Sequence, residues 1–265
     1  MNKAYIPVIL LGLVIAGTFY FLTFYSHEEL APGVCNRVMA NGDVNDKLNI
    51  LYLGDRYASL EEFSKDVKEF NDGFFTVEPY VSLKDEFNVY RYDVLDVDLG
   101  CDQDGTVICS SSKVKNVGKS CPSDFIIVLS DYPESKDLIN PLRSASIFNL
   151  AYVNAADSFL VLSHESGHMV AGLADEYLIP KGKVPRGAVN CVRQCMEFDV
   201  LDECKKGCVN NNHYRSIDLG LMRNYWDTDD FGVFNIKVLE ETILGKASVN
   251  RDALFSPVRE NGVSD

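Results

Sequence analysis

The chain has 265 residues, of which 46% are hydrophobic and 24% charged. This is the composition of an ordinary globular protein, with enough length for one large domain or two small lobes. The formal net charge is −14, and no cluster of Lys and Arg reverses it locally. A nucleic-acid-binding function is therefore excluded, because a polyanion would be repelled.

The N-terminal part predicts a membrane anchor. Residues 6–25 are uncharged and mostly apolar, which is enough to cross a lipid bilayer. Lys3 precedes this segment and acidic residues follow it, which favours a cytoplasmic segment 1–5 and an extracellular remainder. A cleaved signal peptide is the alternative, but residues 24–27 offer no small-x-small cleavage site. We expect an uncleaved anchor.

Residues 26–46 are predicted to form a stalk, residues 47–245 the folded domain and residues 246–265 a polar tail. Within the domain, strand-like and helix-like patterns alternate, so the fold class is expected to be α/β or α+β with a twisted mixed sheet. Strands are predicted at 48–53, 87–94, 125–129 and 147–153. One face of a first helix carries Leu60, Phe63, Val67, Phe70 and Phe74. A second helix is expected between a cap at Asp157 and a stop at Gly172, and a last one between Asp230 and Gly245.

All eight cysteines follow the predicted anchor, where the compartment is oxidising and disulfides are expected. A surface loop at 98–123 contains three of them, and Cys35 is expected to supply the fourth cysteine that two disulfides require. The other four lie in an insert at 188–210 with the spacing Cys191-x3-Cys195-x8-Cys204-x3-Cys208. Nested disulfides, 191 to 208 and 195 to 204, would staple an antiparallel helical hairpin. A structural zinc site of four cysteines is the alternative.

Residues 164–168 read HESGH, which is an HExxH motif. On a helix, His164 and His168 lie one turn apart on the same face, so both imidazoles can bind one metal ion. Glu165 lies beside them and can act as a general base on a water molecule without being a ligand. An amphipathic helix with two incidental histidines is the alternative. The motif predicts Zn²⁺ as cofactor and hydrolysis as chemistry.

A catalytic zinc ion takes three protein ligands and keeps one position open. The third ligand must come from outside the motif. Asp175 and Glu176 follow directly after the predicted helix end at Gly172, and His213 is the other nearby histidine. An acidic pair that caps a loop is the structural alternative for 175 and 176.

The segment 164–177, HESGHMVAGLADEY, resembles the signature of the IgA-peptidase-like metallopeptidases, the igalysin branch of the metzincins. Three further segments are similar to N-terminal blocks of that family: 49–57 (NILYLGDRY), 75–80 (FTVEPY) and 87–91 (FNVYR). The resemblance extends over about residues 47–245. Metzincins place a glycine and then a ligand after HExxH, and here Gly172 and Asp175 keep the spacing between these two, one residue later.

The resemblance implies a metzincin-like zincin fold with His164, His168 and Asp175 as zinc ligands and Glu165 as base. Metzincins also place a methionine in a tight turn below the metal, and Met222 in Leu219-Gly-Leu-Met-Arg-Asn224 fits that role. Tyr225 could lend a hydroxyl group, although a packed tyrosine is the more common outcome.

These observations predict a membrane-anchored extracellular zinc endopeptidase that hydrolyses peptide bonds of a protein or peptide substrate. The substrate would add as a strand to an edge strand, for which 147–153 is the candidate. A non-catalytic surface module that retains a zinc site is the alternative function, against which the intact Glu165 counts. A zincin with a distant glutamate ligand is a third interpretation, disfavoured by the Gly172 to Asp175 spacing and by Met222.

Overall fold

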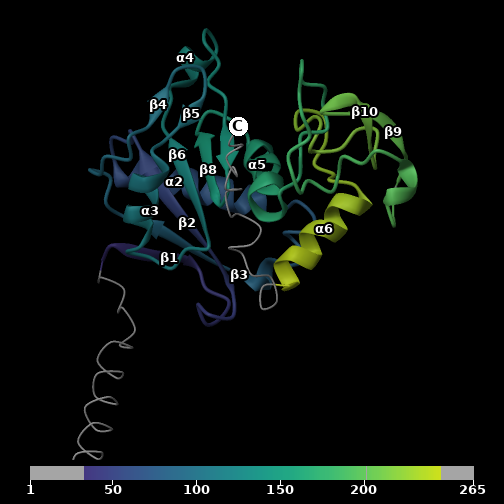
Figure 1. The fold of residues 1–265 in the computed structure, drawn as a ribbon. Helices are drawn as coiled ribbons and strands as arrows, with labels where there is room; N and C mark the ends of the chain where they lie inside the picture. Colours follow the sequence, from purple (N-terminus) through teal and green to yellow (C-terminus); the bar gives the residue numbers. More distant parts are fainter. Residues whose placement is uncertain (1–32, 201, 246–265) are drawn as a thin grey trace, which may run out of the picture.

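A six-stranded mixed sheet forms the centre of the molecule in the computed structural model, which describes residues 33–200 and 202–245 (Figure 1). The strand order is β1-β3-β2-β6-β8-β7. The four inner strands run parallel, and β1 and β7 pair antiparallel with their neighbours at the two edges. The strands are β1 (Cys35–Met39), β2 (Leu48–Asp55), β3 (Phe87–Tyr92), β6 (Phe125–Ser130), β7 (Ala145–Ile147) and β8 (Leu150–Asn154).

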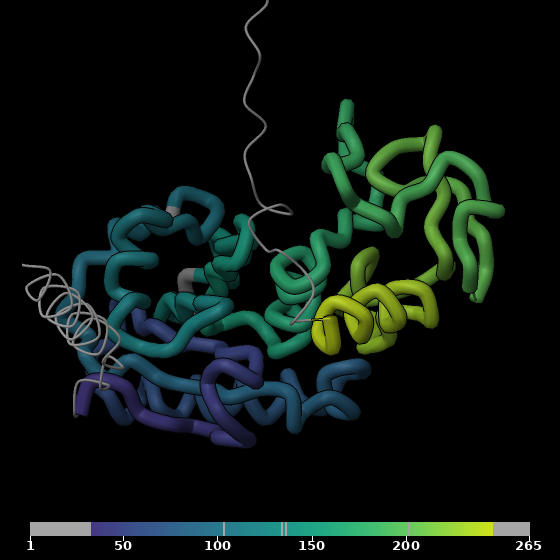
Figure 2. Tube along the Cα trace, turned by 60° about the horizontal axis from the view of Figure 1, so that its bottom comes forward, coloured from purple at the N-terminus to yellow at the C-terminus, as the bar shows by residue number. Residues whose placement is uncertain are grey.

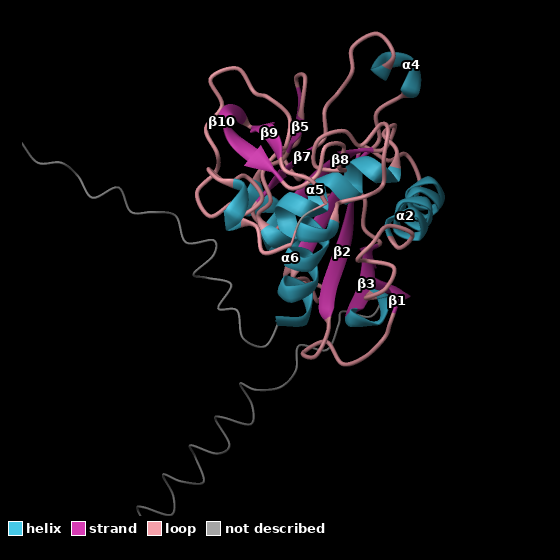
Figure 3. Cartoon of the chain, turned by 90° about the vertical axis from the view of Figure 1, so that its right-hand side faces the viewer, coloured by secondary structure: helices cyan, strands magenta, loops and turns pink. Residues whose placement is uncertain are grey.

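The inner strands are apolar because both faces of the sheet are covered. Along β2, Ile50 and Tyr52 pack into one core, whereas Leu51 and Leu53 pack into another. Helices α2 (Leu60–Phe74) and α5 (Phe159–Ala171) contribute to the first core, as does α6 (Val233–Leu244), and α3 (Ser111–Gly118) contributes to the second. Figure 3 shows α5 and α6 on the same side of the sheet, in front of β2. The mixed α/β prediction is confirmed.

Helix α2 forms as its apolar spacing predicts, and it holds α5 in place. Its N-cap, Ser59, accepts a hydrogen bond from the backbone N–H of Glu62 at 3.2 Å. Near its C-terminal end, Gly73 lets α5 approach closely: a Cβ there would lie 2.3 Å from Cγ of Phe159, the first residue of α5. The helix that bears the HExxH motif is therefore docked at its first turn against α2.

The C-terminal lobe lies beside the sheet, and Figure 2 shows its green and yellow segments gathered at one end of the molecule. It contains a 3-10 turn, η2 (Cys195–Glu197), and a hairpin of β9 (Lys205–Cys208) with β10 (Asn210–Arg215). The two nested disulfides are confirmed, and they exclude a zinc site of four cysteines. The predicted helical hairpin is wrong. Gly207 and Val209 have positive φ angles of 97° and 58°, and three asparagines follow, which favours a turn and strands over a helix.

The predicted boundary of the stalk is corrected by β1. Residues 35–39 pair with β3, and the disulfide Cys35–Cys121 joins this edge strand to the region before β6, as the cysteine count predicts. The segment 98–123 is more than a surface loop. It contains the short pair β4 (Asp102–Gln103) and β5 (Val107–Ile108), closed by Cys101–Cys109, and then α3. The remaining short elements are η1 (Lys84–Glu86) and α4 (Glu134–Asp137).

Several element boundaries differ from the prediction. The predicted strand 147–153 is two strands, because the chain reverses at Phe148, whose φ is +55°. Helix α5 is capped by Ser158 rather than Asp157, and α6 begins after Gly232 rather than Asp230. The predicted ends at Gly172 and Gly245 are confirmed.

Among the described residues, no helix has the length and apolar character needed to cross a bilayer. The predicted anchor at 6–25 and the predicted tail at 246–265 lie outside the described residues.

Candidate metal centre

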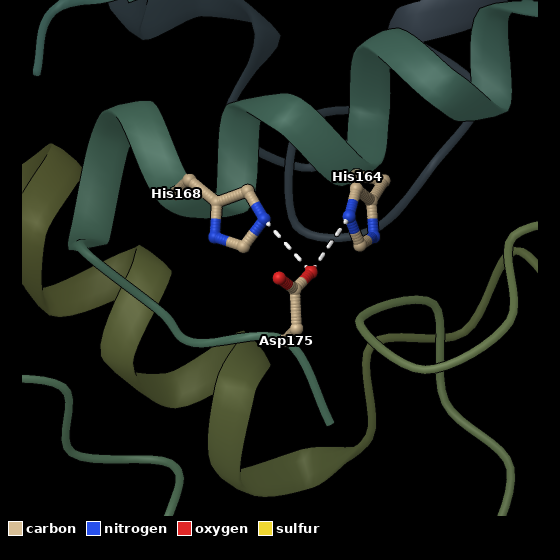
Figure 4. A group of neighbouring side chains, drawn as sticks. All are labelled: His164, His168 and Asp175. Carbon is tan, nitrogen blue, oxygen red and sulfur yellow. Dashed lines mark ion pairs between the residues drawn. The ribbon is translucent and has the colours of Figure 1, made fainter. Parts of the chain in front are cut away.

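Two histidines on α5 project to the same side of the helix (Figure 4). His164 and His168 are separated by one turn, and their ring centroids lie 4.9 Å apart with the planes perpendicular. The His164 side chain is only 3% exposed, and that of His168 is 23% exposed. The pair therefore forms a preformed site with one open side.

Asp175 reaches this pair because α5 ends in a tight turn. Gly172 adopts φ +63°, and its N–H donates to the carbonyl of His168 at 2.9 Å, which closes the helix in the αL arrangement typical of glycine. The chain then turns back below the helix. Oδ1 of Asp175 lies 3.3 Å from Nε2 of His164 and 3.2 Å from Nε2 of His168. The three potential ligand atoms lie within 4.8 Å of one another.

Hydrogen bonds to backbone carbonyls determine which imidazole nitrogens face the centre. Nδ1 of His164 lies 3.0 Å from the carbonyl oxygen of Leu221, and Nδ1 of His168 contacts the carbonyl oxygen of Leu173. A carbonyl can only accept, so each Nδ1 must carry the proton. In the neutral imidazole, each Nε2 then offers its lone pair to the centre. Two lone pairs and a carboxylate oxygen converge, which is the donor set that suits Zn²⁺.

The electrostatics of the centre favour a cation. Burial alone would raise the pKa of Asp175, but the two imidazoles beside it hold that pKa well below its usual range. Burial lowers the pKa of His168, and the facing carboxylate of Asp175 outweighs this and raises it. Oδ1 of Asp175 is buried and has no hydrogen-bond partner among the described residues. A metal ion held between this oxygen and the two Nε2 atoms would satisfy it.

The other two ligand candidates are not at the centre. Glu176 points away into the lobe, where its Oε1 accepts hydrogen bonds from Nδ2 of Asn190 and of Asn235. His213 lies on β10, and its Nδ1 is 2.8 Å from Oδ1 of Asn210. Of the three candidates, only Asp175 faces the two imidazoles.

Glu165 lies beside the centre and lines the same cavity, which has a volume of about 550 Å³. Its side chain is 7% exposed, so it is shielded from bulk water yet borders the cavity. The cavity is also lined by residues of the segment that includes β7 and by residues within 172–186. The three sequence-predicted ligands and the predicted base therefore share one cavity.

The segment around Met222 lies directly below the centre. Met222 is fully buried, and a Cβ at Gly167 would lie 2.5 Å from its Sδ, so the motif glycine is in close contact with this methionine. The carbonyl of Met222 accepts from the N–H of Glu176 at 2.9 Å, next to the predicted third ligand. With Leu221 bound to His164, this segment supports both the helix and the ligand loop. The tight turn is closed by hydrogen bonds from residues 223 and 224 to the carbonyl of Gly220.

Sequence reasoning missed Asn190, which positions the ligand loop. Its side-chain amide pairs with the backbone of Ala174, accepting from the N–H at 2.8 Å and donating to the carbonyl at 2.9 Å. Both groups belong to the residue before Asp175, and Asn190 is fully buried. No local pattern marks this asparagine, because its partner lies 16 residues away.

Two tyrosines border the histidines. The ring of Tyr225 lies 4.9 Å from that of His164, centroid to centroid. Tyr177 is 40% exposed and lines the cavity. Burial raises the pKa of each phenol, so both remain protonated donors at neutral pH.

Comparison of the chain with protein-family models and with curated proteins gives no match.

Proposed function

We propose that the chain is a zinc endopeptidase of metzincin type, in which His164, His168 and Asp175 hold the metal and Glu165 is the general base. The observation that carries this proposal is the convergence of two Nε2 lone pairs and an unpartnered carboxylate oxygen in a cavity that Glu165 also lines. A structural metal site needs neither a base nor an adjacent cavity.

The chemistry divides between the metal and the chain. A zinc ion held there would lower the pKa of a water molecule and polarise the carbonyl group of a substrate. Glu165 accepts a proton from the attacking water at its carboxylate and delivers it to the nitrogen of the leaving amine. The hydrogen bonds from the Leu221 and Leu173 carbonyls keep the two imidazoles in the correct tautomer.

The substrate is proposed to bind as an extended strand along β7. This strand is at the edge of the sheet, and residues 144–146 line the cavity. An edge strand has backbone groups that no neighbouring strand pairs, and a peptide can satisfy them by β-augmentation. The edge strand that the substrate is proposed to join is therefore residues 145–147 and not the predicted 147–153, because β8 lies between β6 and β7.

Support for a metzincin-like arrangement comes from the lower side of the centre. The buried Met222 contacts the motif glycine, and the backbone of its segment binds both His164 and the ligand loop. The position of the domain outside the cell, anchored through residues 6–25, belongs to the same proposal. The four disulfides support it, because disulfides are typical of oxidising compartments.

Two variants of the full-length chain test the proposal. Glu165→Gln should retain about one zinc ion per chain and lose turnover of a peptide library by at least about 100-fold, because the amide cannot accept the proton. Asp175→Ala should instead lose zinc, since two imidazoles alone bind it weakly. Glu61→Gln and Asp46→Ala are matched controls at exposed positions outside the cavity.

The measurements are metal content by elemental analysis and peptide cleavage by mass spectrometry. Full turnover by Glu165→Gln would exclude its role as base. Stoichiometric zinc in Asp175→Ala would exclude it as a ligand. Zinc bound by the intact chain without cleavage of any peptide would favour the non-catalytic surface module.

A further inference from the structure

Two arginines from separate segments of the chain line the cavity of the candidate metal centre. Arg143 lies two residues before β7, and Arg186 belongs to the segment that follows Asp175. Both side chains are exposed. Neither forms an ion pair with any acidic side chain in the described part of the chain. The cavity is therefore lined by two cationic side chains that no acidic side chain of the described residues offsets.

Hydrogen bonds fix the backbone of Arg143, and Arg143 lines the cavity. Its N–H donates to the carbonyl of Gly105 at 3.2 Å, and its carbonyl accepts from the N–H of Val107 at 2.8 Å. Arg143 is thus held between the β5 segment and β7. A guanidinium on a fixed backbone at a cavity wall is suited to bind a planar anionic group, because it offers parallel donors to two oxygens.

An exposed aromatic residue lies at the end of β7. Phe148 is 51% exposed and lines the cavity, and its φ of +55° is a left-handed conformation that residues other than glycine rarely adopt. Tyr177 also lines the cavity and is exposed. An exposed aromatic ring beside an edge strand can pack on the apolar part of a bound peptide.

The charges of the cavity are separated by position. Glu165 and Asp175 are at its centre, and a divalent cation bound there would offset their two negative charges. The arginines lie on the walls, where no acidic partner offsets them. Carboxylates of a bound molecule would therefore be repelled from the unloaded centre and attracted to the walls.

We propose that the substrate class of this site is an extended acidic peptide, in which Asp or Glu side chains on either side of the scissile bond pair with Arg143 and Arg186. This inference rests on the proposed peptidase function. The peptide backbone pairs with β7, and Phe148 packs on an apolar part of the peptide. The two arginines then select among peptides whose backbones bind equally well.

The test separates binding from cleavage. Full-length Glu165→Gln loaded with zinc is titrated with two fluorescent peptides, one rich in Glu and its counterpart with every Glu replaced by Gln. The intact chain is given the same pair in a cleavage assay. We expect the Glu peptide to bind and to be cleaved about 10-fold better at low salt, with the preference narrowing at 0.5 M NaCl.

Arg143→Gln and Arg186→Gln should each reduce the preference for the Glu peptide by about 3-fold. Arg143→Glu should shift the preference toward a Lys-containing counterpart. Lys65→Gln, an exposed change of the same charge on α2, is the control and should keep the preference.

The two possible failures are distinguishable. Three results would each overturn the acidic-peptide inference. They are equal affinity for the Glu and Gln peptides, a preference for the Lys peptide by the chain with both arginines intact, and no binding of any peptide. Selective binding of the Glu peptide without cleavage by the intact chain would support the inference while refuting the peptidase function on which the site was first proposed.

Discussion

Asp157 connects the start of the HExxH helix to a wall of the cavity. It directly precedes the N-cap of α5, and its Oδ2 accepts a hydrogen bond from Oγ of Ser144 at 2.7 Å. Burial raises the pKa of Asp157 to about 6, and the charges of Asp137 and Glu165 add to the increase against the effect of that hydrogen bond. We therefore predict that Asp157→Asn stabilises the protein at neutral pH.

Proton linkage gives the sign of this change in stability. A free aspartate titrates at 3.8, so between pH 3.8 and about 6 the folded state retains a proton that the unfolded state has lost. Stability from this group therefore falls as pH rises through that window, and the penalty is complete above it. Two pKa units correspond to about 3 kcal/mol, and partial exposure of the side chain reduces this to about 1 to 2 kcal/mol. The asparagine retains an oxygen that can accept from Ser144.

The assay is urea unfolding of the metal-free chain at pH 3.5 and pH 7.5, with the free energy of unfolding extrapolated to water. Asp157→Asn should match the parent at pH 3.5 and exceed it by about 1 to 2 kcal/mol at pH 7.5. Asp85→Asn, at an exposed site, controls for the loss of one negative charge. A variant that is less stable than the parent at pH 7.5 would refute the reasoning, because the carboxylate would then be stabilised by the α5 N-terminus more than burial penalises it.

Two further substitutions test the support of the centre. Gly167→Ala forces Met222 to shift, so the overpacking cost of about 1 to 3 kcal/mol should exceed the helix-propensity gain of about 1 kcal/mol. In a Met222→Ala background only the Phe231 ring, at 3.1 Å, remains close to the added Cβ, so the same change should cost less. Thermal unfolding of the four chains measures both costs, and a stabilising Gly167→Ala in the parent would contradict the contact. Asn190→Ala leaves the N–H and carbonyl of Ala174 unpaired, so the free energy of unfolding should fall by about 2 to 4 kcal/mol. Zinc affinity should also weaken. A competition assay that finds unchanged zinc affinity would exclude the positioning role of Asn190.

The candidate centre was predictable where its geometry is local. The one-turn spacing of His164 and His168 places both imidazoles on one side of any α-helix, whatever surrounds it. Gly172 ends that helix, because a left-handed residue stops the hydrogen-bond ladder. The nested disulfides were also predictable from spacing and compartment. The type of hairpin was not predictable from the cysteine spacing. A spacing of four residues suits a helix, but the glycine and asparagines near β9 and β10 favour strands.

Contacts between residues that are distant in sequence depend on the tertiary structure. The Leu221 carbonyl that orients His164 lies 57 residues after it, and Asn190 finds its partner only when the lobe folds back on the ligand loop. The choice of Asp175 over Glu176 likewise depends on which direction the loop faces after Gly172. The sequence by itself determined the two histidines, the proposed base and the helix that presents them, because these depend on periodicity within one element. The tertiary structure decided the tautomers, the carboxylate that faces the two imidazoles and the lining of the cavity, because each requires contacts between elements that no local pattern encodes.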